Sequence, residues 1–139
     1  MYITYPQPNG QVAVVFPFGD VNGAIKDIPE GVEYKIVESV EIDNNYFGAY
    51  EFDAEAGIKI NISKAKPIHL DKFRSARTPL LAALDVAFMR AVESGDVDLQ
   101  KEIASKKQAL RDVTSIDLPD NLADIKATWP EILGSNPFA

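Results

Sequence analysis

Cysteine is absent from this chain of 139 residues. Its absence excludes disulfides, thiolate nucleophiles and cysteine-ligated zinc sites together. Histidine is nearly absent too, since His69 is the only one, and a single imidazole cannot form a histidine-based metal site. The glycines match neither a dinucleotide-binding GxGxxG nor a phosphate-binding P-loop, and no GxSxG is present. The sequence therefore favours a protein that is not an enzyme, with no catalytic residue, metal site or cofactor.

Long apolar runs and an excess of positive charge are also lacking. No stretch approaches the roughly 20 apolar residues that span a bilayer, so no membrane partner is expected. The first ten residues, MYITYPQPNG, lack the basic and apolar regions of a signal peptide, which favours cytoplasmic synthesis without Sec export. The net charge is −7, from 14 Lys and Arg against 21 Asp and Glu. Such an acidic protein is not expected to bind nucleic acid, because phosphate contacts need a positive face.

Charge is unevenly distributed along the chain. Residues 1–63 carry three Lys against ten Asp and Glu, a balance of −7. Residues 64–77 carry five Lys and Arg against Asp71 alone, a balance of +4, and residues 78–139 return to −4. We interpret the short basic stretch as a solvated face or as an intramolecular partner of the acidic first half.

The first sixty residues have the pattern of short β-strands. YITY and QVAVVF flank PQPNG, where Asn9 and Gly10 are expected to supply the positive φ angles of a hairpin turn. Asp20 is placed to cap a short helix at about residues 20–27. EYKIVESVEI predicts a third strand, and GAYEFDAEAGIKINI predicts two more around a turn near residues 53–57. The nine aromatic residues of this half are interpreted as core and sheet surface.

From Ser63 onward the apolar spacing becomes helical. Ser63 is expected to cap a helix that runs to about Ala76, and Thr78 to cap a second helix that has Pro79 as its first residue. The second helix has an apolar stripe at a spacing of three and four residues: Leu81, Leu84, Phe88 and Val92.

The segment SGD at residues 94–96 should end that helix, with Asp96 capping the next one. The stripe of this next helix is formed by Leu99, Ile103, Leu110 and Val113. Two amphipathic helices joined by so short a turn should pack as an antiparallel hairpin. A final short helix is expected to be capped by Asp120 and to end before Pro130.

These elements predict an α+β fold, with a small N-terminal antiparallel β-sheet followed by a C-terminal helical hairpin and a short final helix. The expected regions are a β-rich region at residues 1–62, a helical region at residues 63–130, and a loosely held tail at residues 131–139. The chain is too short for two ordinary domains, so the regions should form one compact unit.

One set of motifs resembles a known family. RSARTPLLAALDVAFMRAVESGD, then KKQALRDVT, and finally TWP occur in the order seen in the C-terminal part of bacteriophage tail assembly chaperones, a group that includes the tail-fibre assembly proteins. Upstream, KDIPEGVEYKIV and AYEFD are similar to the N-terminal region of small phage tail proteins. The matching positions of the helical part are Arg74, Arg77, Leu80, Leu81, Asp85, Gln108, Leu110, Arg111, Asp112, Trp129 and Pro130.

The resemblance implies a protein without catalytic activity that binds a phage tail-fibre or tail-tip protein. It would act in the host cytoplasm during assembly or remain in the virion tail. The residues that it favours for partner binding are Trp129, Pro130, Arg111, Arg77 and Arg74. A small virion structural protein, such as a tail-tip or fibre-adaptor subunit that oligomerises, and a ligand- or host-binding module that uses the aromatic β half both stay open. Trp129 has two interpretations, as an interface anchor or as the residue that packs the last helix onto the hairpin.

Overall fold

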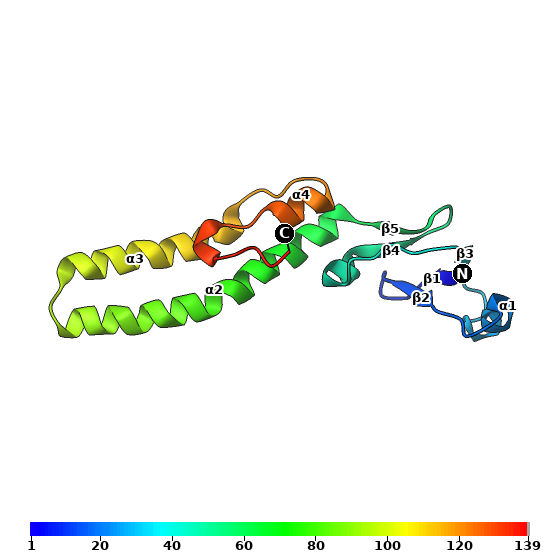
Figure 1. The fold of residues 1–139 in the computed structure, drawn as a ribbon, viewed down its shortest axis with the longest axis horizontal. Coiled ribbons are helices and arrows are strands. Elements are labelled where there is room, and N and C mark those ends of the chain that lie inside the picture. The colour runs from blue at the N-terminus through cyan, green and yellow to red at the C-terminus, as the bar shows by residue number, and fades with distance from the viewer. Residues whose placement is uncertain (139) are drawn as a thin grey trace. The chain divides into compact units, whose positions relative to one another are not determined.

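A computed structural model describes residues 1–138. The chain divides within helix α2 into two units, residues 1–68 and residues 69–139. The strands are β1 (Tyr2–Pro6), β2 (Val12–Val15), β3 (Lys35–Val37), β4 (Tyr50–Asp53) and β5 (Gly57–Ile60). The α-helices are α1 (Val21–Ala24), α2 (Ile62–Glu93), α3 (Val97–Asp112) and α4 (Leu122–Ala127), and the 3₁₀ turns are η1 (Ile25–Asp27), η2 (Asn44–Ala49), η3 (Val113–Ser115) and η4 (Glu131–Leu133) (Figure 1).

The α+β fold is confirmed, because antiparallel strands precede long helices in the chain. The strands form two sheets rather than one: a three-stranded sheet in the order β2-β1-β3 and a two-stranded sheet of β4 and β5. Both expected hairpins are present, with β1 pairing antiparallel with β2, and β4 with β5.

The turn of the first hairpin uses glycine alone for its left-handed conformation. Gly10 has a φ of 84°. No residue other than glycine has a positive φ in the described part of the chain, so the prediction of a positive φ at Asn9 was wrong. Asn9 instead accepts a hydrogen bond from the Gln11 N–H through its side-chain oxygen, at 3.0 Å. Short polar side chains commonly stabilise turns in this way. Further on, Asp20 accepts from Asn22 N–H and begins α1, as predicted.

Contacts between the two sheets hold the first unit together. The Thr4 hydroxyl of β1 is fully buried and donates to the Gly57 carbonyl of β5 at 2.7 Å, which satisfies a polar group inside the core. Ile3, on the opposite face of β1, is also fully buried. The central strand is therefore covered on both faces.

Helix α2 is continuous from Ile62 to Glu93, so the two separate helices expected on either side of Thr78 are a wrong prediction. Thr78 does not cap a helix, because its hydroxyl donates back to the Arg74 carbonyl four residues earlier, at 2.9 Å. Pro79 lies inside the helix and lacks the N–H that would bond to the carbonyl four residues before it.

Two further caps differ from prediction by one or two residues. Ser63 lies inside α2, and it is the carbonyl of Asn61 that accepts from the N–H groups of Lys64 and Ala65. Asn61, rather than Ser63, therefore precedes the first turn. The last helix is capped by Asn121, whose side chain accepts from Asp124 N–H, and not by Asp120.

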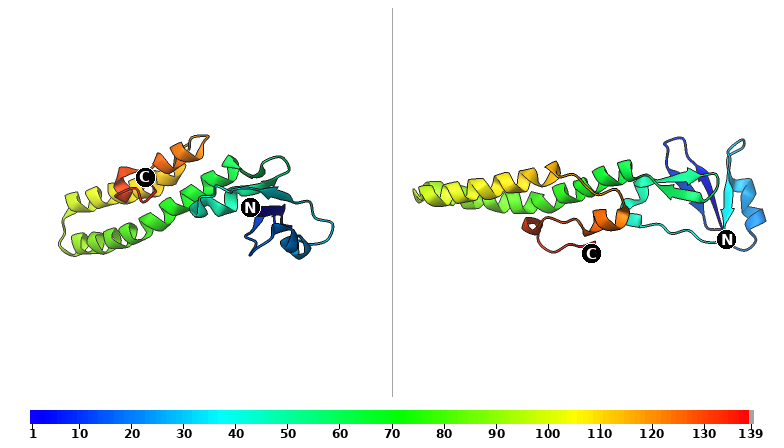
Figure 2. Two further views of the ribbon diagram at one scale, coloured as in Figure 1. Left: turned by 45° about the vertical axis from the view of Figure 1, so that its right-hand side comes forward. Right: turned by 90° about the horizontal axis from the view of Figure 1, so that it is seen from above.

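Helices α2 and α3 form the expected antiparallel hairpin, and they lie side by side in all three ribbon views (Figures 1 and 2). Ser94 and Gly95 make the turn, and Asp96 accepts from Leu99 N–H at 3.0 Å to begin α3, as predicted. Lys107 of α3 pairs with Asp85 of α2. The predicted stripes hold in part, because Ile103 and Leu110 are buried whereas Val92 and Leu99 are exposed.

The C-terminal segment is packed, so the expectation of a loosely held tail was wrong for residues 131–138. Leu133 of η4 is buried. Asn136 donates through its side-chain amide to the Lys126 carbonyl at 2.8 Å, and its side-chain oxygen accepts from Phe138 N–H. Figure 2 shows α4 and the residues after it folded back along the hairpin. Residue 139 lies outside the described residues.

Candidate functional site

Four aromatic rings fasten the C-terminal segment onto α2. His69 and Phe73 lie one helical turn apart on α2, and Trp129 and Phe138 reach them from the C-terminal segment. Every pair in contact is edge-to-face, with ring centroids 4.9 to 6.1 Å apart, the geometry that the ring quadrupoles favour. The ammonium group of Lys72 lies 4.9 Å from the centre of the Phe138 ring and adds a cation–π contact.

His69 is the polar centre of this cluster. Its ring is fully buried, and Nε2–H donates to the Thr128 carbonyl at 2.8 Å. Burial lowers the pKa of His69, the nearby Lys72 charge lowers it further, and the bond to Thr128 opposes both. An imidazole that is enclosed and bonded to the main chain is suited to hold the end of α4 in place.

The predicted binding residues are used largely inside the fold. Trp129 lies in the aromatic cluster, with its Nε1 shielded from solvent and without a hydrogen-bond partner among residues 1–138. Pro130 directly precedes η4. Arg77 donates from Nη1 to the carbonyls of Leu110 and Arg111, at 3.3 and 2.9 Å, and so satisfies the end of α3.

The other two arginines remain at the surface. Arg74 pairs with Asp71 one turn earlier on α2, and both side chains are exposed. The main-chain carbonyl of Arg111 accepts a hydrogen bond from Arg77, and Arg111 is exposed. Arg77 and Arg111 are thus brought together through the backbone of α3, whereas Trp129 and Pro130 belong to the aromatic cluster. Sequence reasoning did not include His69, Phe73 or Phe138 in the cluster, although the four-residue spacing of His69 and Phe73 placed both on one helical face.

An apolar groove lies on one side of the hairpin. It consists of two adjoining hollows of about 340 and 440 Å³ that share Ala83. The groove is lined by Leu80, Ala83, Leu84, Val86, Ala87, Arg90, Ala91, Ser94, Leu99, Lys106, Leu110 and Ile132. Small side chains at Ala83 and Ala87 leave room between the larger ones, and Leu80, Val86 and Leu99 are exposed at its sides.

The groove follows from having only two helices. The C-terminal segment packs on α2 at His69 and Phe73 and contributes Ile132 to the groove lining. Beyond that segment each helix of the hairpin has one neighbour, so an apolar stripe wider than the contact stays open to solvent. The sequence contains this second stripe in Leu80, Ala83, Ala87 and Ala91, spaced by three and four residues. The sequence prediction considered only the larger apolar side chains, and it missed this stripe because three of its four members are alanines.

Within residues 1–138 there is no cluster of three or more His, Asp and Glu side chains that could hold a metal ion. No helix of that part is both long and apolar enough to cross a membrane. The chain matches no protein-family model, no curated protein and no solved structure.

Proposed function

We propose that this protein is a bacteriophage tail or tail-fibre assembly chaperone, which binds a separate fibre or tail-tip polypeptide and performs no chemistry on it. The observation that carries the proposal is the open apolar groove on the α2–α3 hairpin. Grooves of this kind accept an amphipathic segment of a partner through its apolar face. The ordered motifs of the helical half, which resemble those of tail assembly chaperones, support the same function.

The physical need for such a helper is clear. Tail fibres are long and rich in β-structure, and their unassembled chains expose unpaired strand edges and apolar surface. A small protein can cover an apolar segment until the fibre closes. Arg90 lines one end of the groove, so the best-matched segment carries an acidic residue at the margin of its apolar face.

A small virion structural subunit is the second candidate, and the same groove favours it. A hairpin with one open apolar side can pack against a second copy or an adaptor protein and remain in the particle. A chaperone should bind in the host cytoplasm and be missing from finished particles, whereas a structural subunit should be present there at a fixed ratio.

The test combines capture from infected cells with mass spectrometry of purified particles. Two neighbouring alanines of α2 give a matched pair of variants, since both are exposed but only Ala83 lines the groove. Ala83→Arg should abolish capture of a fibre or tail-tip protein, and Ala82→Arg should retain it. Equal capture by both variants would contradict the groove as the binding surface, and stoichiometric presence in particles would replace the chaperone with the structural subunit.

A further inference from the structure

Strand β2 is an edge strand of the three-stranded sheet in the first unit. The Gln7 N–H donates to the Gln11 carbonyl at 2.8 Å, which fixes the alternation of the β1–β2 ladder. In that alternation the N–H and C=O groups of Ala13 and Val15 point toward β1, and those of Val12 and Val14 point away from it. No other strand pairs with β2 on that side in the described part of the chain.

An apolar hollow of about 310 Å³ lies beside this edge. It is lined by Tyr2, Val14, Phe16, Val40, Ile42, Asn44 and Phe47. The rings of Tyr2 and Phe16 meet edge-to-face at 5.0 Å, and Phe16 nevertheless keeps 66% of its surface exposed. A large aromatic side chain held in place but left in solvent is typical of a binding surface.

A second, acidic hollow adjoins the first. The two share Val40, Ile42 and Asn44, and the second also includes Glu41 and Asp43. The whole unit is acidic, because residues 1–68 contain five Lys against ten Asp and Glu, a balance of −5. The charge around the hollow therefore favours a cationic partner.

We propose that this surface binds an extended, basic peptide segment that adds a strand to the outer edge of β2. An added strand places alternate side chains on the face that carries Val14, so one of them enters the apolar hollow. A large aliphatic or aromatic side chain fills that space, and a Lys or Arg two residues away, on the same face of the added strand, lies against Glu41 and Asp43. The occupant is thus a strand-forming segment in which a Phe, Tyr, Leu or Ile has a basic residue two positions away.

Two alternative occupants fit less well. A second copy of this unit would bring its own charge of −5 to an acidic surface, which opposes self-pairing. The one basic stretch of the chain, residues 64–77, lies within helix α2 and is not available as a strand. The proposal uses the β half alone and does not depend on the function proposed for the hairpin.

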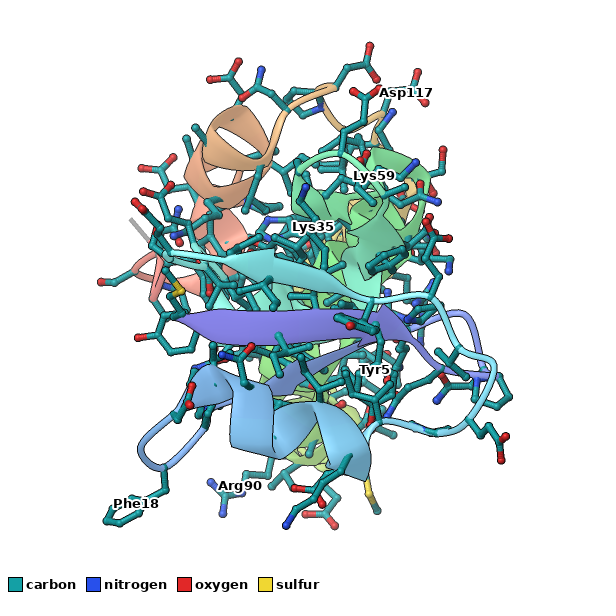
Figure 3. All side chains as sticks on the ribbon, turned by 90° about the vertical axis from the view of Figure 1, so that its right-hand side faces the viewer. Tyr5, Phe18, Lys35, Lys59, Arg90 and Asp117 are labelled. Carbon is teal, nitrogen blue, oxygen red and sulfur yellow. The ribbon has the colours of Figure 1, made fainter. Side chains whose placement is uncertain are left out.

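The test uses the full chain and a blocked synthetic peptide, acetyl-Thr-Lys-Thr-Phe-Thr-Lys-Thr-amide, which places both Lys on the same strand face as Phe. Affinity is measured by isothermal titration at low and moderate salt. Phe16→Ala should weaken binding at least tenfold, by loss of an interface aromatic residue. Phe18→Ala is the matched control. Phe18 is fully exposed, projects from the loop after β2, and does not line the hollow (Figure 3).

A second pair of variants tests the charge. Glu41→Lys should weaken binding several-fold, and the loss should shrink as salt is added. Glu33→Lys makes the same change in net charge at an exposed position outside both hollows and should have a smaller effect.

Two measurements on the unmodified protein complete the test. A peptide N-methylated at alternate residues should lose binding, because it cannot form the strand ladder. Amide shifts on titration with the unmodified peptide should be largest at Val12, Val14 and Phe16. The proposal is overturned by no detectable binding of the basic peptide, by equal binding of a peptide with Glu in place of Lys, or by equal effects of Phe16→Ala and Phe18→Ala.

Discussion

Gly57→Ala should destabilise the first unit by about 2–5 kcal/mol. Gly57 has a φ of +84°, and a Cβ added there would lie 2.6 Å from Val37 Cγ1 and 3.0 Å from the Thr4 hydroxyl oxygen. Neither neighbour can move away easily, because valine is stiff at χ1 and Thr4 is bonded to the Gly57 carbonyl. The left-handed conformation costs a non-glycine residue about 1–2 kcal/mol, and overpacking adds about 1–3 kcal/mol.

Gly31→Ala separates these two costs. Gly31 has a similar φ of +77°, but no other atom lies within 4 Å of an added Cβ. It should cost only the backbone part, about 1–2 kcal/mol. The double variant Gly57→Ala with Val37→Ala should recover part of the packing cost, which a double-mutant cycle measures.

The assay must report on the first unit. Trp129, the only tryptophan, lies in the second unit, so its fluorescence would miss the effect. Hydrogen exchange of the β1 and β5 amides in native conditions measures the opening free energy locally. If Gly57→Ala and Gly31→Ala differ by less than about 0.5 kcal/mol, then the close approach of β5 to β1 and β3 is not a stability constraint, and the reasoning fails.

Three further predictions concern the second unit. Burial holds the pKa of His69 below its usual value, so the unfolded chain binds the proton more readily than the folded one. The contribution of His69 to the free energy of unfolding is therefore fully present above about pH 6.5 and is lost as the pH falls below that value. Urea midpoints followed by Trp129 fluorescence should decrease between pH 7.5 and 5.5, and His69→Gln should remove this pH dependence. Arg77→Ala leaves two carbonyls at the end of α3 without their donor and should cost about 1–2 kcal/mol, whereas Arg74→Ala, at an exposed ion pair, should cost less than about 1 kcal/mol in the same assay. Asp96→Ala removes the cap of α3 and should cost about 1 kcal/mol, with faster amide exchange limited to the start of that helix.

The sequence alone predicted the start of an element correctly where a single side chain or glycine determines it. Asp20 and Asp96 accept the N–H groups expected of helix caps, and Gly10 supplies the turn of the first hairpin. These signals are local, since donor and acceptor lie within three residues of each other. They predict the order and type of the elements, and the α+β class followed from them.

Sequence failed where distant contacts outweigh a local signal. Thr78 and Pro79 have the pattern of a helix start, yet α2 passes through them. Phe73 packs under Trp129 before the proline, and Arg77 and Asp85 bond to α3 on both sides of it. An internal proline costs about 3 kcal/mol. Contacts made by α2 both before and after Pro79 can together contribute more free energy than that cost. Their partners are distant in the sequence, so no pattern within the helix reveals them.

The basic stretch shows a similar dependence on distant residues. Lys64 at the start of α2 pairs with Glu51 of β4 at 2.9 Å, and hydrogen bonds from Asn61 and then Lys64 lower the pKa of Glu51. One of the two interpretations of this stretch, an intramolecular partner for the acidic half, therefore applies to Lys64. Arg74, by contrast, pairs within its own helix at the surface. A sum of charges along the chain could not separate the two cases.

The two uses of aromatic residues bear on where a partner binds. Trp129 had two interpretations in the sequence, as an interface anchor or as the residue that packs the last helix onto the hairpin. Its contacts with His69 and Phe73 inside the second unit favour the second. Phe16 and Phe18 belong to the aromatic set that was interpreted as core and sheet surface, and they are among the most exposed large apolar side chains of residues 1–138. Exposing them costs the folded protein burial energy that it could have gained. Apolar surface that the fold leaves open, at Phe16 and along the hairpin groove, is therefore a better guide to partner binding here than the single tryptophan.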